Sequence, residues 1–170
     1  MEQNLESKIE LKNKIINFYN LNKFKIYIFI FLLLSILTAI TLIEYNNQKK
    51  NILISEKYIE AGMNLAASRN ENAKLLYEEI ILSKNKFYSI LSLNAIIEKN
   101  LISDEKKILS YFEILENMNF QEEKYDLIIF KKALFYFKIL EKKEGINLLE
   151  KLIEKNSKFR NLAEEITTNQ

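Results

Sequence analysis

The chain has 170 residues, a formal net charge of +2 and a charged fraction of 28%, and it contains no cysteine, histidine, proline or tryptophan. The missing residue types exclude disulfides, thiol chemistry, zinc and haem sites built on cysteine or histidine, and every histidine-dependent catalytic triad. Because acidic and basic residues nearly balance, the sequence lacks the basic face that nucleic-acid binding requires.

Residues 1–25 form a polar lead with five lysines and three glutamates. Apolar residues occur in it at loosely helical spacing, at Leu5, Ile9, Ile16 and Tyr19. Two interpretations stay open for this segment, a short amphipathic helix on the inner face of a membrane and a disordered lead.

Residues 26–43 carry no charge over 18 consecutive positions. As a helix they cover roughly 27 Å, close to the hydrocarbon core of a bilayer at about 30 Å. Phe24, Tyr27 and Tyr45 lie near the ends of the stretch, where aromatic side chains favour the membrane interface. The sequence therefore predicts a transmembrane helix over 26–43.

Two alternatives to a permanent anchor fit the stretch less well. A buried helix of a soluble domain usually carries a polar stripe, and a cleaved signal peptide has a shorter lead, a shorter apolar run and a small-residue cleavage site. Five lysines precede the span, whereas Lys49, Lys50 and Lys57 follow it. This bias favours a cytoplasmic tail, a single-pass protein of the bacterial inner membrane, and a periplasmic C-terminal domain.

Residues 44–170 are expected to form an all-α domain, because apolar residues recur at spacings of three and four and no strand-like alternation persists. Asparagine and serine dominate the breaks, as in helix caps, and Asp104 is expected to cap a helix or to lie in its first turn. The seven helices expected cover about 50–69, 71–83, 86–100, 104–118, 122–140, 142–155 and 158–167, the first continuing from the membrane helix.

A shift of the chain by 72 residues aligns two of its parts. The coincident pairs are Ala61/Ala133, Ala73/Gly145, Leu76/Leu148, Ile80/Leu152, Ile81/Ile153 and Phe87/Phe159. The two small residues of each copy are 12 positions apart, which predicts one on each helix of a hairpin, where the backbones approach closely. Hairpin units of this kind cannot bury their apolar face alone and stack on their neighbours.

On these residues, the segment 50–167 resembles a tetratricopeptide (TPR) repeat array. The two pairs of small residues look like the helix-packing positions of that motif. The middle unit departs from it, with Ile97 and Leu109 in the equivalent places. We therefore expect about three helix pairs and a short terminal helix, with the middle pair packed at an unusual angle.

A lysine-bearing tail, one N-terminal span and a single TPR-like domain together resemble the ancillary SecYEG translocon subunit family (YfgM-like). The resemblance implies an inner-membrane protein with a periplasmic helical domain. It also implies association with the Sec translocon and with periplasmic chaperones.

Residues 124–140 are the most apolar part of the domain. Lys131 and Lys132 lie in the middle of this segment, and each would cost roughly 2.5–3.5 kcal/mol at the centre of a bilayer. We therefore predict the central helix of the array, covered by its neighbours, and not a second membrane span.

No catalytic, cofactor or metal site is predicted. The adjacent glutamates at 78/79, 122/123 and 164/165 point about 100° apart on a helix, so they do not converge on one atom as paired catalytic carboxylates do. Glycines at 62 and 145 alone cannot form a phosphate-binding loop.

A stack of hairpins exposes a concave surface made by the first helix of each pair. Tyr88, Asn94, Tyr125 and Lys132 are predicted to line it. The expected function is that of a membrane-anchored protein-binding repeat protein, which docks a helix or an extended segment in the groove. By resemblance, its partners are the SecYEG translocon and periplasmic chaperones. The alternatives are a structural scaffold of an envelope assembly and a membrane-tethered enzyme, for which no nucleophile and base can be named.

Overall fold

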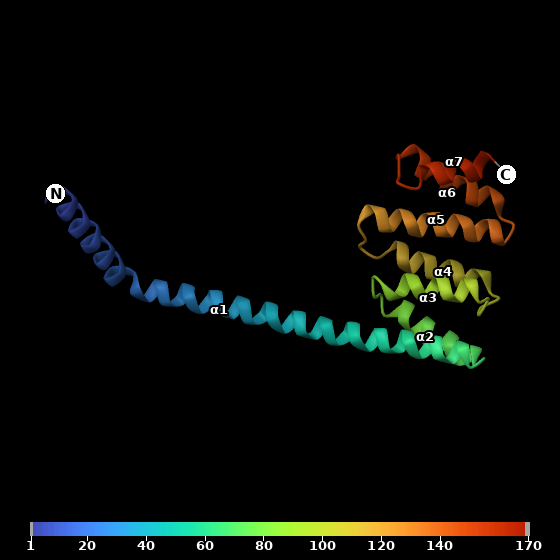
Figure 1. Ribbon diagram of the computed structural model, residues 1–170, viewed down its shortest axis with the longest axis horizontal. Coiled ribbons are helices and arrows are strands. Elements are labelled where there is room, and N and C mark those ends of the chain that lie inside the picture. The colour runs from blue at the N-terminus through green and yellow to red at the C-terminus, as the bar shows by residue number, and fades with distance from the viewer. Residues whose placement is uncertain (1, 169–170) are drawn as a thin grey trace. The chain divides into compact units, whose positions relative to one another are not determined.

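The computed structural model describes residues 2–168, and it describes side chains for residue 12 onward with the exception of residue 15. In this part of the chain the secondary structure is helical, without strands. The helices are α1 (Glu2–Ala66), α2 (Asn70–Leu82), α3 (Tyr88–Glu98), α4 (Glu105–Glu116), α5 (Glu122–Lys138), α6 (Lys142–Glu154) and α7 (Arg160–Thr168) (Figure 1). The chain divides into two units, Met1–Lys50 and Asn51–Gln170.

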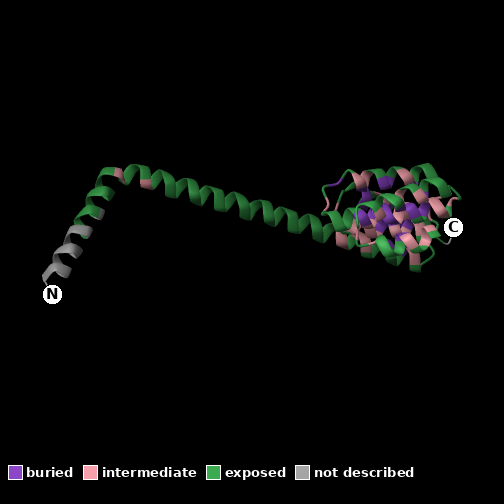
Figure 2. Ribbon diagram, turned by 90° about the horizontal axis from the view of Figure 1, so that it is seen from above, coloured by how far each residue is buried: buried purple, intermediate pink, exposed green. Residues whose placement is uncertain are grey.

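The first unit is helical and its described side chains are mostly exposed (Figure 2). Among the described residues, α1 is the one helix long and apolar enough to cross a membrane; its most apolar 18-residue window has a mean hydropathy of 2.8 and is not buried at all. The hydroxyls of Ser35, Thr38 and Thr41 donate to main-chain carbonyl oxygens three or four residues earlier, at 2.8–2.9 Å. The segment 26–43 therefore satisfies its polar side chains within its own helix, as a lipid environment requires.

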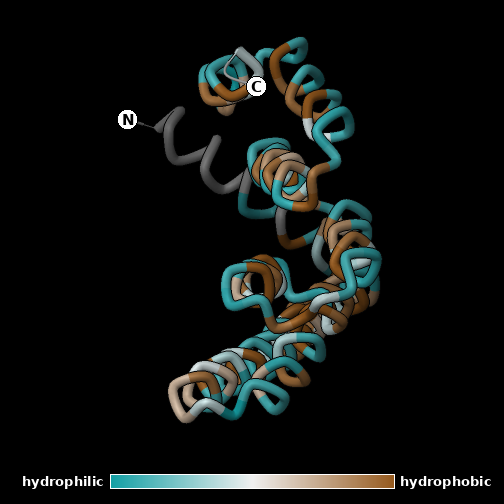
Figure 3. The backbone as a smooth tube through the Cα atoms, turned by 90° about the vertical axis from the view of Figure 1, so that its right-hand side faces the viewer, coloured by the Kyte–Doolittle hydropathy of each residue, from teal (hydrophilic) through white to brown (hydrophobic). Residues whose placement is uncertain are grey.

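The second unit is a row of helices that lie side by side in chain order (Figure 1). Its first helix is the end of α1, where the ring of Tyr58 packs against Tyr77 of α2 and Tyr88 of α3, with centroids 5.6 and 5.5 Å apart. Figure 3 shows hydrophobic and hydrophilic positions mixed within the turns of the helices, as expected of amphipathic helices that share a core.

Helix α5 contributes to both apolar cores of this unit. Ile128 and Phe135 pack into the core formed with α2, α3 and α4. Phe130 and Ala133 pack into the second core, formed with α6 and α7. The prediction of a core helix here, and not of a second span, is confirmed.

The helix ends lie close to the expected ones, and the role of Asp104 is confirmed. Its Oδ1 accepts hydrogen bonds from the main-chain N–H groups of Lys106 and Lys107, at 3.0 and 3.2 Å. Five helices, α1, α2, α3, α5 and α6, are each followed, two residues after their last residue, by a residue with positive φ that is not glycine. These residues are Ser68, Lys84, Asn100, Leu140 and Asn156, with φ between 49° and 65°.

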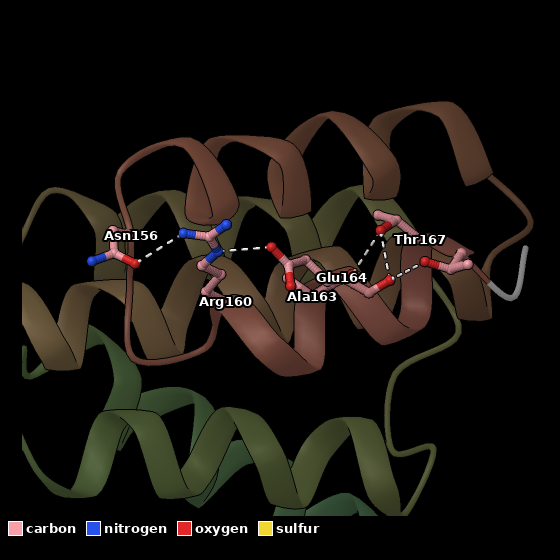
Figure 4. Close-up of polar contacts among 6 residues, drawn as sticks. Asn156, Arg160, Ala163, Glu164 and Thr167 are labelled. Atoms are coloured by element: carbon pink, nitrogen blue, oxygen red, sulfur yellow. Dashed lines mark hydrogen bonds and ion pairs between the residues drawn. The ribbon is translucent and has the colours of Figure 1, made fainter.

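The last helix is fixed at its start by Arg160 (Figure 4). The guanidinium donates to Oδ1 of Asn156 at 3.2 Å and to Oε1 of Glu164 at 2.7 Å. Ala163, on the same helix, is fully buried in the second core. Polar contacts and apolar burial thus hold α7 against the array.

The 72-residue shift found in the sequence recurs in the helix bounds. Helices α1 and α5 end 72 residues apart, α2 and α6 begin and end 72 residues apart, and α3 and α7 begin 72 residues apart. The buried positions recur in the same way, as Ala61/Ala133, Ala73/Gly145, Tyr77/Leu149 and Ile80/Leu152. The two parts of the chain therefore share one local plan of helices and buried side chains.

Gly145 marks a close approach of α5 and α6. A Cβ at this position would lie 3.0 Å from Cζ of Phe137 and 3.1 Å from the main-chain oxygen of Ala133. Gly62, the other glycine, has open space around the corresponding point. Only one of the two glycines is therefore required by packing.

We expect Gly145→Ala to destabilise the helical unit by about 1 kcal/mol, because overpacking outweighs the gain in helix propensity. Gly62→Ala is the matched control and should stabilise by up to about 1 kcal/mol, since it gains the same propensity without a clash. Urea denaturation of the full chain in detergent micelles, followed by circular dichroism, measures both. Equal effects of the two substitutions would contradict the close approach.

A second pair of variants tests the buried serines of α3. The hydroxyl of Ser89 donates to the Ile80 carbonyl oxygen at 3.0 Å, whereas that of Ser92, also fully buried, has no hydrogen-bond partner among the described residues. We expect Ser89→Ala to cost about 1 kcal/mol of unfolding free energy and Ser92→Ala to gain a similar amount. The same denaturation experiment checks the signs, and a loss at both positions would refute the assignment.

Candidate functional site

The four residues predicted to line a groove lie in different surroundings. The ring of Tyr88 is half-buried and packs against Tyr58 and Phe87, with centroids 5.5 and 5.0 Å apart. Tyr125 is about one-third exposed, and Nζ of Lys155 lies 5.8 Å from its ring centroid. Asn94 lines a hollow between α3 and α5, whereas Lys132 does not line this hollow.

Lys132 ties α5 to α4. Its Nζ lies 2.7 Å from Oε1 of Glu116, and the two side chains are only 13% and 21% exposed. An ion pair this enclosed is costly to break from one side, because the remaining charge loses its partner without regaining full hydration.

The hollow between α3 and α5 has a volume of about 220 Å³. Lys131, the neighbour of Lys132, lies here half-buried, and no ion-pair partner for it occurs in the described part of the chain. Leu134 adds an exposed apolar side chain. The lining consists of Asn94, Ile97, Glu98, Lys131, Leu134, Phe135 and Lys138.

Lys138 closes one side of this hollow. Its ammonium donates to the Ile97 carbonyl oxygen at 2.8 Å and to Oδ1 of Asn100 at 2.7 Å, so that it caps the carboxyl end of α3. Ile97, Phe135 and Lys138 also line a second hollow of about 210 Å³, which extends to the loop between α3 and α4. The α3–α5 face thus offers two adjoining hollows of mixed polarity.

A larger hollow, of about 880 Å³, lies between the end of α1 and α2. Its apolar side chains include Ile59, Met63 and Leu75, each more than half exposed. Glu56, Glu60 and Arg69 supply charge. Sequence reasoning did not single out this surface, although Ile59 and Met63, four positions apart on the helix, were an available signal.

Two buried tyrosines have raised pKa values. Burial raises the pKa of Tyr111, and a hydrogen bond to the Glu78 carboxylate and its charge raise it further. Burial, and then Tyr58, raise the pKa of Tyr77. Both rings belong to the larger apolar core. Among the described residues no group of three or more acidic side chains is placed to hold a metal ion.

Sequence reasoning also missed a buried polar contact at Asp126 of α5. This carboxylate is 3% exposed, forms an ion pair with Lys155 and accepts a hydrogen bond from the Ser157 hydroxyl at 2.5 Å. It thereby ties α5 to the segment between α6 and α7. The signal in the sequence was an acid within an otherwise apolar run.

Comparison of the chain with protein-family models, with curated proteins and with solved structures finds no match. The assignment of a function therefore depends on the geometry of the helical unit and on the character of α1.

Neighbouring lysines of α5 should differ in their effect on stability. Lys132→Ala leaves Oε1 of Glu116 buried without its cation, so we expect a loss of about 2 kcal/mol or more. Lys131→Ala removes a side chain without such a partner and should change the unfolding free energy by less than about 0.5 kcal/mol. Urea denaturation of both variants measures the difference, and similar losses would contradict it.

Proposed function

We propose that the protein is anchored in a membrane by residues 26–43 and binds other proteins through a TPR-like helical domain. The observation that carries this proposal is the contrast between the two units. One contains a charge-free helical segment with no burial, and the other is a folded helical domain with open, partly apolar hollows. An anchored domain of this kind acts as a docking platform beside the bilayer.

The TPR-like arrangement is supported by the 72-residue recurrence of helix bounds and buried positions. In a repeat array, each hairpin buries its apolar face against the next, and α5 packs on both sides in this way. Gly145 at the α5–α6 approach suits the position where such hairpins come closest.

The α3–α5 face is the proposed docking groove. Lys131 has a charge available for an acidic side chain, Asn94 offers an amide for main-chain groups, and Leu134 and Ile97 offer apolar contact. These groups suit an extended segment that carries an acid next to an apolar residue. The anchor would confine this weak contact to the membrane plane and raise the effective concentration of the partner.

The site of action is proposed from the architecture. The lysine bias around the span supports a cytoplasmic tail and a periplasmic domain in the bacterial inner membrane. The resemblance to the ancillary SecYEG translocon subunits then supports a role at the Sec translocon or in handover to periplasmic chaperones.

Two steps test the proposal in the native bacterium. The protein should stay in the membrane pellet after carbonate extraction and should become accessible to protease only in spheroplasts. A photocrosslinking amino acid at Asn94 or Leu134 should then label SecYEG subunits or periplasmic chaperones, as identified by mass spectrometry. Both positions are on the proposed groove, and the label should be lost with Lys131→Glu.

The control carries the crosslinker at Glu150, an exposed position of α6 that lines none of the described hollows. Release by carbonate would refute the anchor. Labelling of the same proteins from all three positions would refute the groove. A stoichiometric homo-oligomer as the sole crosslinked product would support the alternative of an envelope scaffold.

A further inference from the structure

The face of α1 and α2 that lines the 880 Å³ hollow is unusual for the first unit of a helical array. Met63, at its centre, is 57% exposed, and Ile59 and Leu75 are exposed to a similar degree. Terminal units of such arrays normally present a polar outer face, because no neighbour covers them. An apolar face at this position therefore calls for a covering partner.

The chain itself contains a copy of this face with its cover in place. With the 72-residue shift, Met63 corresponds to Phe135 of α5, which is only 3% exposed. Phe112 of α4 covers Phe135, with the two ring centroids 5.9 Å apart, and Phe135 also lines the hollow that α3 forms with α5. Helix α4 thus shows one element that fits the open face, an amphipathic helix with an apolar residue at the Phe112 position.

The α5 face and the α1 face carry opposite charges at corresponding positions. On α5, Lys132 faces α4 and pairs with Glu116 at 2.7 Å. The residue 72 positions earlier is Glu60, and Glu56 stands where α5 has the buried Ile128. Neither Glu56 nor Glu60 has an ion-pair partner in the described part of the chain, and two like charges at i and i+4 repel each other.

We propose that the α1–α2 hollow binds an amphipathic helix of a partner protein that carries a lysine or arginine four residues after an apolar anchor. The anchor takes the place of Phe112 against Met63, and the base takes the place of Glu116 against Glu60. Arg69, at the far end of the hollow, adds one cation to the lining. This inference deepens the proposed protein-binding function and rests on it for the premise that the helical domain is a docking platform.

A second copy of the chain is a poorer occupant. A symmetric pair formed through this face would bring Glu56 and Glu60 of both copies into one interface, four carboxylates against the two guanidinium groups of Arg69. A head-to-tail stack would bring up the last helix, α7, with the exposed Glu165 and with Glu164 already engaged by Arg160. Both arrangements set carboxylates against carboxylates, which disfavours them.

A pair of labelled peptides tests whether the hollow prefers a basic residue at the position of Glu116. The first has the native sequence of residues 104–118, which contains α4, and the second carries Glu116→Lys. We measure their binding to the full chain in detergent micelles at low salt by fluorescence anisotropy. The lysine peptide should bind about fivefold more tightly than the native one, and the preference should reverse with the Glu60→Lys protein.

Two exposed positions give matched controls. Met63→Asp should abolish binding of the lysine peptide, whereas Leu82→Asp should not, because Leu82 is 61% exposed on α2 but does not line the hollow. Equal affinity of the two peptides, no binding, or an unchanged preference with Glu60→Lys would overturn the proposal. Self-association that Met63→Asp removes, measured by light scattering, would overturn it in favour of a second copy.

The peptide assay needs neither the inner membrane nor the translocon. Its failure would therefore leave the crosslinking result at Asn94 and Leu134 standing, and a failure of the crosslinking would leave the peptide result standing.

Discussion

Burial of α5 on two faces is the constraint on which the helical unit depends. Ile128 and Phe135 face α4, and Phe130 and Ala133 face α6 and α7. A helix that is apolar on both sides cannot be stable as the outer member of a pair, because one side would remain in water. It therefore requires helices before and after it in the chain, and it joins what would otherwise be two small cores.

Polar contacts fix how the neighbours of α5 sit on it. Lys132 reaches α4, Lys138 caps the end of α3, and Asp126 holds the segment between α6 and α7. Each contact pairs a charge with a group on another helix or on the loop next to it, so each favours one register over the others that apolar packing would tolerate.

Much of the helical plan was predictable from the sequence, and the surfaces were less so. Helix bounds, the Asp104 cap and the assignment of 124–140 to the core follow from local patterns that do not depend on neighbours. The surroundings of Lys131 and Lys132 differ although the residues are adjacent, because successive side chains on a helix point about 100° apart. Which of the two meets Glu116 depends on how α4 packs, which no local pattern encodes. The sequence shows Ile59 and Met63 on one side of their helix, but that this side stays open also depends on how the helices pack.

The helix ends with positive φ affect how the fold tolerates change. Asparagine adopts this conformation readily, as at Asn100 and Asn156, whereas Ser68, Lys84 and Leu140 adopt it at roughly 1 kcal/mol each. Together these three residues cost about 3 kcal/mol, which is a sizeable share of the net free energy of unfolding of a small domain. They lie outside the apolar cores, and Leu140 is almost fully solvent-exposed. Glycine or asparagine at Ser68, Lys84 and Leu140 would relieve this conformational cost and raise the thermal stability, and none of the three residues lines a described hollow.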